Sequence, residues 1–363
     1  MWLKIEARPA PSDRMRYLSP LIAVALTLVT GLIFSGVMAL NPLDTFHAFF
    51  IAPIDDWYGL AELGVKAIPL VLIGTGLAIG FRANVWNIGA EGQLTMGAIF
   101  GGGVALYFYG EQGFFILPLM FVTGAVGGML WASIPAFLRT RFNTNEILVS
   151  LMLNYVAIFI LSFLVHGPWR DPDGFNFPES RLFSESASLP IILEGTRLHL
   201  GAFVALAAVA IAWVFVRKSF LGYQMQVAGM AHAAALYAGF KRKRMVWVGL
   251  LCGGGAAGVA GLMEVAGPIG QLLPSVSPGY GYAAIIVAFV GRLHPVGCLL
   301  AGLLMSLLYL GGESAQMNLG LPSAVTGVFQ GILLFYLLAA DLFINFRVRR
   351  NTPVPGPAAE AGP

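Results

Sequence analysis

Charged residues are scarce in this sequence. Only 11% of its 363 residues are Asp, Glu, Lys or Arg, whereas 58% are hydrophobic. Soluble globular domains carry about 25% charged residues, so the composition excludes a soluble fold and indicates an integral membrane protein. Cysteine is also rare: Cys252 and Cys298 both lie in apolar runs, which indicates two buried free thiols and no disulfide framework.

The sequence also lacks the common motifs of enzyme chemistry. It has no Gly-x-x-x-x-Gly-Lys-Ser/Thr pattern, so it does not bind ATP through a P-loop. It has no His-Glu-x-x-His motif, no Cys/His cluster for a metal and no Gly-x-Ser-x-Gly elbow. GGGAAG at 253–258 fits Gly-x-Gly-x-x-Gly, but it lies inside an apolar run with no strand before it. We interpret it as a helix-packing surface, and no catalytic pair supports a membrane enzyme.

Long apolar runs are what the sequence has in abundance. About 20 apolar residues span a bilayer as a helix, and ten segments are candidates. They are residues 18–40, 62–82, 92–109, 114–138, 145–166, 200–216, 245–266, 279–291, 296–311 and 323–345, of which the eighth is short. The first run is too long for the core of a signal peptide. The sequence therefore predicts an all-α polytopic membrane helix bundle whose transmembrane domain covers residues 18–346.

The basic residues predict how this bundle is oriented. With ten crossings and a cytoplasmic N-terminus, all but four of the 21 Lys and Arg residues fall inside, as the positive-inside rule requires. The four exceptions are Lys66, Arg170, Arg181 and Arg197. The predicted cytoplasmic parts are 1–17, the large inner loop 217–244, and the tail 347–363, and the long outer loop is 167–199. The tail is rich in Pro and Gly after Arg350, so we expect it to be disordered.

The inner loop contains a short helix pattern with one face of small residues. Ala231, Ala234, Ala235 and Ala238 recur at i, i+3, i+4 and i+7, and Gly229 and Gly239 bracket them as start and stop signals. A small, smooth face suits close docking on another protein. The alternative is an amphipathic helix lying on the bilayer, for which alanine gives little apolar area.

A polar stretch, NVWNIGAEGQL at 84–94, interrupts the apolar runs. Gly89 and Gly92 weaken a helix there and free backbone groups, which is tolerated at membrane depth only inside protein or beside a watery cavity. Asn87, Glu91 and Gln93 could satisfy those groups as a structural knot, or they could line the inner end of a polar path. The residues alone leave both interpretations open.

The segment Asn143-Thr-Asn-Glu146 opens the fifth apolar run. Asn at the N-cap with Glu three residues later is a capping-box pattern. It predicts a helix start at this point.

Three stretches and the inner loop resemble one family. The loop pattern Gly-x-x-x-x-Ala-Ala-x-x-x-Gly resembles the coupling helix of ABC importer permeases for simple sugars, nucleosides and branched-chain amino acids. NVWNIGAEGQLTMGA (84–98), NTNEILVSLMLNYVA (143–157) and GYGYAAIIVAFVGRLHPVG (279–297) resemble the nucleoside-type permeases. Simple-sugar permeases typically have an Asp-Leu-Ser version of the first stretch. The resemblance covers roughly residues 60–340.

The resemblance implies a type II-like ABC importer permease, a transport subunit and not an enzyme, in the bacterial cytoplasmic (inner) membrane with both termini cytoplasmic. It implies three protein partners besides the lipid bilayer, and no nucleic acid: a cytoplasmic ATPase docked on the coupling helix, a second permease subunit and an extracytoplasmic substrate-binding lipoprotein. This chain needs no cofactor, since ATP and Mg belong to the ATPase.

The resemblance also adds Asn145, Glu146 and Asn154 to the candidate translocation path. Few charged residues line the apolar runs, which suits nucleosides or related neutral polar solutes. A simple-sugar ABC permease and an ion-coupled secondary transporter remain the alternatives. The latter would need paired intramembrane acids, and Glu91 is a single acid.

Overall fold

The computed structural model describes residues 3–8, 12–37 and 40–350. Its elements are α-helices, three short helical turns and one two-stranded sheet, which confirms the prediction of an all-α polytopic membrane bundle. The part of the predicted disordered tail from residue 351 onward lies outside the described residues. Both cysteines are free thiols, and Cys298 is buried.

The chain divides into two compact units. Unit 1 contains residues 1–43 and 327–363, and unit 2 contains residues 44–326. The predicted membrane domain, 18–346, therefore extends over both units.

Unit 1 is built on α1 (Asp13–Val37) and most of α13 (Ala324–Asn345). Ser19 donates a hydrogen bond of 2.6 Å to Asp341, and the hydroxyls of Thr30 and Tyr336 lie 2.7 Å apart. Strands β1 (Leu3–Ala7) and β2 (Phe346–Arg350) pair antiparallel. The sequence predicted no strands in these segments, which lie in or next to the predicted cytoplasmic parts 1–17 and 347–363.

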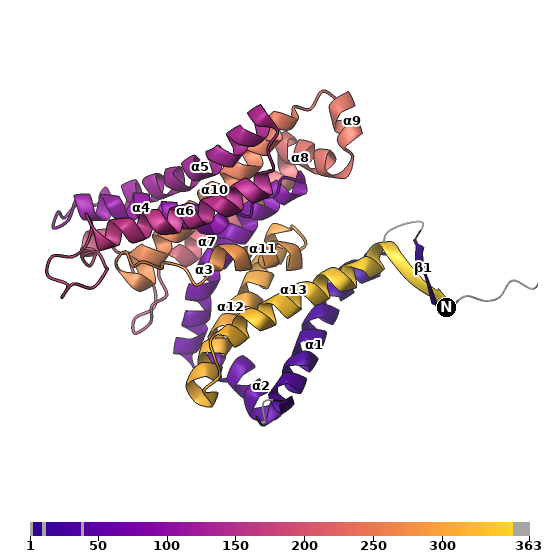
Figure 1. The fold of residues 1–363 in the computed structure, drawn as a ribbon, viewed down its shortest axis with the longest axis horizontal. Helices are drawn as coiled ribbons and strands as arrows, with labels where there is room; N and C mark the ends of the chain where they lie inside the picture. Colours follow the sequence, from indigo (N-terminus) through magenta and orange to yellow (C-terminus); the bar gives the residue numbers. More distant parts are fainter. Residues whose placement is uncertain (1–2, 9–11, 38–39, 351–363) are drawn as a thin grey trace, which may run out of the picture. The chain divides into compact units, whose positions relative to one another are not determined.

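Unit 2 contains most of α2 and all of the other remaining elements, traced in Figure 1. They are α2 (Pro42–Phe50), η1 (Ala52–Ile54), α3 (Trp57–Arg82), α4 (Ala90–Tyr107), α5 (Ile116–Phe142), α6 (Glu146–His166), η2 (Glu185–Ala187), α7 (Gly201–Lys218), α8 (Phe220–Met230), α9 (His232–Tyr237), α10 (Arg242–Glu264), the π-helical turn η3 (Val265–Ile269), α11 (Tyr280–Val290) and α12 (Pro295–Leu319).

Helix α10 forms the centre of unit 2 and packs against α3, α4 and α5. The contact is backbone to backbone, because the GGGAAG stretch of α10 faces glycines of its neighbours. A methyl group on Gly258 would overlap the carbonyl of Gly124 and lie 3.0 Å from the Cα of Gly128. The interpretation of this stretch as a packing surface is therefore confirmed. Close van der Waals contact between the helix backbones stabilises this packing, as it does between helices in lipid.

All ten predicted apolar segments are helical, but two of them fall short as spans. Among the described residues, eight helices are long and apolar enough to cross a membrane, and α4 and α11 are not among them. Helix α4 begins with the polar residues Glu91 and Gln93. Helix α11 has 11 residues, so it rises about 16 Å, roughly half the hydrocarbon thickness.

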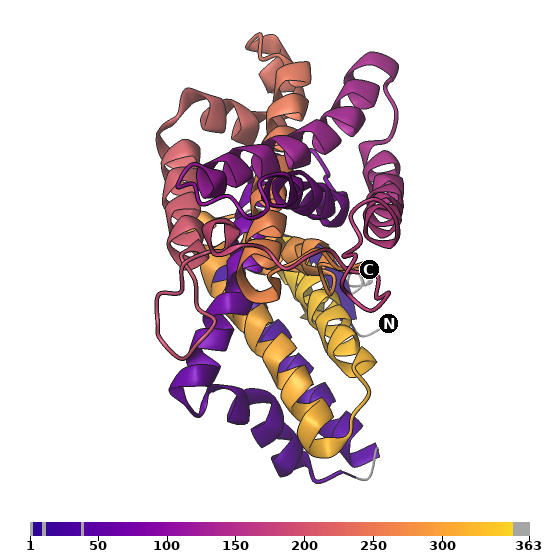
Figure 2. The same cartoon turned by 90° about the vertical axis from the view of Figure 1, so that its left-hand side faces the viewer.

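Several basic residues of unit 2 lie close to α8 and α9. Arg139 and Arg242 border the same cavity as Ala235 of α9, and the Arg82 carbonyl lies against Gly229 of α8. Figure 1 shows α8 and α9 at one end of the unit, and the mostly irregular segment between α6 and α7 lies at the opposite end (Figure 2). For these residues the placement agrees with the predicted division of charge, while the side facing the cytoplasm stays a prediction.

His199, in the segment before α7, is a buried titratable group. Its side chain is 2% exposed, and Nδ1 accepts a hydrogen bond of 3.2 Å from the Gly201 amide. Burial lowers the pKa of His199 from 6.5 to about 4. The unfolded chain binds a proton near pH 6.5 and the folded chain does not, so protonation disfavours the folded state below that pH.

We expect the melting temperature of the detergent-solubilised protein to fall as the pH is lowered from 6.5 towards 4. The loss approaches about 3 kcal/mol for a pKa shift of this size. His199→Asn keeps an acceptor near the position of Nδ1 and does not titrate, so its melting temperature should depend less on pH in this window. An identical pH dependence in the two proteins would contradict this assignment.

Candidate functional site

The polar stretch begins where α3 ends. After Arg82 the chain leaves the helical conformation, with Asn84 at φ 56°, and helix resumes only at Ala90. Trp86 anchors this connection: its ring centroid lies 5.3 Å from that of Phe81 and 5.6 Å from that of Phe289 in α11. The stacked rings hold the non-helical segment against α3 and α11.

Two amides of the stretch satisfy each other. Asn87 Nδ2 donates to Gln93 Oε1 at 2.8 Å, and Gln93 Nε2 donates back to Asn87 Oδ1 at 3.1 Å. Asn87 Oδ1 also accepts from the Gly89 amide at 3.0 Å. Both side chains are buried, so this reciprocal pair pins the turn into α4 and uses most of its hydrogen-bonding capacity within the chain.

Asn154 on α6 joins the same cluster. Its Oδ1 accepts from the Gly92 amide at 2.9 Å, and its Nδ2 donates to the carbonyl of Ile88 and to the hydroxyl of Tyr282, each at 3.0 Å. One side chain from another helix therefore satisfies both a free N–H and a free C=O of the interrupted backbone.

Glu91 binds the start of α11. Its Oε2 accepts from the Gly281 amide at 2.7 Å, and Ser277 and the Gly279 backbone also interact with the carboxylate. Gly279 adopts φ 97° and ends an extended approach to α11. A carboxylate at this position satisfies amides that the first turn of a helix leaves free and complements its dipole.

Two helices therefore begin side by side in the interior of unit 2. Discontinuous helices of this kind form binding sites in transporters, where irregular backbone lines a cavity. The hydrogen bonds favour the structural reading of Asn87, Gln93 and Asn154. Tyr282, which is 37% exposed, is the member of the cluster open to the surface of the unit.

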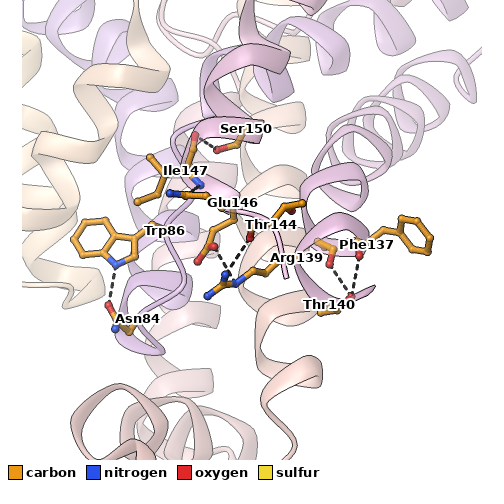
Figure 3. A network of polar contacts seen from close by, with 11 residues as sticks. Asn84, Trp86, Phe137, Arg139, Thr140, Thr144, Glu146, Ile147 and Ser150 are labelled. Carbon is orange, nitrogen blue, oxygen red and sulfur yellow. Dashed lines mark hydrogen bonds and ion pairs between the residues drawn. The ribbon is translucent and has the colours of Figure 1, made fainter. Parts of the chain in front are cut away.

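Glu146 lies in a second cluster with Arg139 and Thr144 (Figure 3), close to α8 and α9. Asn145 precedes it as the N-cap of α6. Asn145 accepts from the Ile147 amide as the N-cap of α6, whereas Asn143 is the left-handed C-cap of α5. The predicted capping box is therefore wrong in register, by two residues. Glu146 pairs with Arg139 at 3.0 Å and does not reach back to the cap.

This second cluster borders a cavity of about 240 Å³ shared with the inner loop. Arg139 also donates to the Thr144 carbonyl at 3.0 Å, which ties the ends of α5 and α6 together (Figure 3). The structure thus separates the predicted path residues into an interior cluster (Asn87, Glu91, Gln93, Asn154) and a cluster at the end of the unit (Asn145, Glu146).

The inner loop differs from the single helix predicted between Gly229 and Gly239. Gly229 belongs to α8, the chain breaks at Ala231, and α9 runs only from His232 to Tyr237. Gly239 ends the helix region with φ 76°, as predicted for a stop signal. Ala235 is 3% exposed and faces the cavity within this chain, while Ala231, Ala234 and Ala238 are exposed.

Sequence reasoning missed the partners that complete these clusters. Arg139 and Ser277 lie in or beside apolar runs and belong to no quoted stretch. Tyr282 lies in the stretch 279–297, but nothing in that stretch indicated a contact with Asn154. Contacts such as that of Tyr282 with Asn154 join residues 128 positions apart, which no local pattern encodes.

Comparison with known proteins gives matches over most of the chain. Residues 59–338 match the family model described as "Branched-chain amino acid transport system / permease component". The glucose ABC transporter permease protein TsgB13 of Haloferax volcanii is 34% identical, covering 98% of this chain and 97% of the relative. The guanosine ABC transporter permease protein NupP of Bacillus subtilis is 31% identical over 91% of this chain and 94% of its own length. The nucleoside ABC transporter permease protein NupB of Lactococcus lactis is 27% identical over 89% and 90%.

Replacing Glu91 tests what its carboxylate does. Glu91→Gln keeps an acceptor for the Gly281 amide, so the melting temperature and solute uptake should stay close to wild type. Glu91→Leu leaves a buried N–H unpaired, which costs about 1–3 kcal/mol, and should lower both. Loss of uptake in a well-folded Glu91→Gln protein, together with loss of its pH dependence, would show instead that Glu91 carries a proton.

Proposed function

This chain belongs to the family of permease components of the branched-chain amino acid transport system, and we propose that it moves nucleosides or related neutral polar solutes across the membrane. It is a multi-pass membrane permease subunit of an ABC importer. The observation that carries the choice of solute is the position of Glu91. The start of α11 is already occupied by this carboxylate, so it offers no free site to an anionic group.

A neutral solute also fits the other groups of the interior cluster. Tyr282 and the Asn154 amide offer hydroxyl and amide hydrogen-bonding groups, and the ring of Tyr282 offers an exposed aromatic surface. An aromatic ring beside neutral hydrogen-bonding groups suits a solute with a planar ring and hydroxyls. The names of two relatives, a guanosine and a nucleoside permease, support this choice.

A neutral sugar is the second candidate, because the relative with 34% identity is named a glucose permease. Uptake by membrane vesicles containing the complete transporter separates the two. We expect radiolabelled guanosine to accumulate and excess unlabelled nucleoside, but not glucose, to compete. Accumulation of glucose that nucleosides do not inhibit would refute the nucleoside assignment.

The proposed energy source is a separate ATPase that holds ATP and Mg and docks on α8 and α9. Met230 and Tyr237 are 80% and 97% exposed, and the four basic residues 241–244 follow directly. These residues give the docking surface an apolar centre and a basic edge, so the complementary surface of the ATPase should have an apolar groove with acidic residues at its edge. A second permease subunit and an extracytoplasmic binding lipoprotein complete the proposed importer, in the inner membrane with cytoplasmic termini.

An ion-coupled mechanism has less support. The carboxylate of Glu91 is bonded to the start of α11. Uptake that requires ATP and survives collapse of the ion gradients supports the importer. The opposite result would favour a secondary transporter.

Ala234 gives a direct test of the docking surface. Ala234→Arg places a long charged side chain on the exposed face of α9, where a packed contact would have to desolvate it. We expect normal membrane abundance, at least tenfold less co-purified ATPase and loss of uptake. Ala235 is unsuitable because it is buried within this chain.

Gln112→Arg is the matched control, since it adds the same side chain at an exposed position of the opposite end. It should keep the ATPase bound. Normal ATPase recovery and uptake with Ala234→Arg would rule out this face as the docking site.

The proposed orientation of unit 2 is supported by the distribution of basic residues along the sequence. We expect cysteines introduced at Asp173 and Arg244 to react with a membrane-impermeant maleimide from opposite sides, Asp173 in intact cells and Arg244 only after permeabilisation. The unsubstituted chain measures the background from Cys252 and Cys298. Labelling of both positions in intact cells would refute the proposed topology.

A further inference from the structure

One close backbone contact joins the docking loop, which is formed by α8 and α9, to the end of α3. Gly229, in the last turn of α8, lies against the carbonyl group of Arg82 at the end of α3. A methyl group on Gly229 would overlap that oxygen and lie 3.0 Å from the carbonyl carbon. A displacement of α8 towards α3 is therefore passed to Arg82 without a compressible side chain between them.

The side chain of Arg82 makes the next contact. Its Nε donates a hydrogen bond of 2.8 Å to the carbonyl of Leu293. Leu293 lies in the four-residue turn from Gly291 to His294 that joins α11 to α12. Arg292 and Leu293 have φ 58° and 53°, a left-handed conformation that residues other than glycine rarely adopt. Consecutive residues of this kind persist only where contacts enforce them, and Arg82 supplies such a contact.

Helix α11 carries this contact into the interior. Its last turn stacks on α3 through Phe289 and Phe81, with centroids 5.4 Å apart. Its first turn is held by Glu91, 2.7 Å from the Gly281 amide. Non-helical joints lie at both ends, at Gly279 and at the turn after Val290. A short helix with a joint at each end can tilt as a rigid body.

We propose that Arg82 is a positioning residue that couples the α8–α9 docking loop to α11, so that movement of the loop tilts the start of α11 beside Glu91 and Tyr282. This inference rests on the proposed function, because the movement originates in the docked ATPase. It assigns to α11 the opening and closing of the interior cluster. Arg82 itself does not touch the solute.

The test follows the position of Tyr282 in the complete transporter. Tyr282→Cys introduces a thiol at an exposed position in the first turn of α11, and its alkylation rate is measured with and without ATP plus orthovanadate, which holds an ATPase after hydrolysis. We expect nucleotide to change the rate at least fivefold. This readout does not depend on which solute is carried.

Arg82→Gln in this background removes the donor to Leu293, and we expect the change to shrink below twofold while the ATPase still co-purifies and hydrolyses ATP. Arg82→Lys should restore part of the response, because its ammonium group can still donate to a carbonyl. Arg141→Gln is the matched control: it removes an exposed arginine from the same end of unit 2 and should keep the full response.

Gly229→Ala tests the same link from its other side and leaves the guanidinium intact. It should also reduce the nucleotide-dependent change in the alkylation rate. The double variant with Arg82→Gln should show the same change as the more impaired of the two single variants, since both substitutions break one connection. If Arg82→Gln fails to insert, the response of Gly229→Ala alone tests this connection.

Three results would each overturn the role of Arg82. They are a full response in Arg82→Gln, an alkylation rate of Tyr282→Cys that nucleotide does not change while Arg82 is retained, and additive effects of Arg82→Gln and Gly229→Ala. Absence of an ATPase from the wild-type preparation would refute the proposed function, and this role with it.

Discussion

The backbone of a membrane-embedded chain has no water to bond with, so every N–H and C=O that leaves a helix must find a partner inside the protein. Two of the non-helical segments of unit 2, the one between Arg82 and Ala90 and the one before Tyr280, meet in its interior. Asn154 bonds to the free backbone groups of Ile88 and Gly92 beside the first segment. Glu91, just after the first segment, bonds to the free amide of Gly281 after the second. The two interruptions are therefore mutually dependent, and the polar residues of an otherwise apolar region gather at their meeting point.

Close glycine packing is what allows this meeting point to be enclosed. Helices α5 and α10 approach until Gly128 and Gly254 leave no room for a side chain, and α4 packs against both. Such contacts give rigidity by dispersion and close fit, so the surrounding helices act as a frame. Helix α11 differs in length, because it is about half as long as a span. It packs against α3, α4 and α12, and it is flanked by non-helical residues at Gly279 and after Val290. The proposed tilt would therefore move α11 as one body against these neighbours.

Much of this arrangement could be predicted from sequence, and the failures have physical causes. Apolar length located every long helix, and the polar stretch at 84–94 was recognised as an anomaly. Periodicity could not show that Asn145, and not Asn143, caps α6, since Asn143 takes the left-handed C-cap of α5 instead. It could not show that α9 begins at His232, because the break at Ala231 depends on packing of the loop. The partners of Glu91 and Asn154 are far away in sequence, so tertiary contact alone identifies them.

The form of α9 also bears on what it contacts. The helix has six residues, and an isolated helix of this length is unstable in water, so contacts must hold it. One such contact is internal: Ala235 is buried beside the cavity that Arg139 and Glu146 border. Helix α9 also exposes Tyr237 and part of Leu236, which is little area for binding to a bilayer but is enough to fill a pocket of a folded partner. Because the internal contact fixes the direction of α9, a partner bound to its exposed side would act on the ends of α5 and α6 as well as on α8, and the docking surface would move as part of the permease.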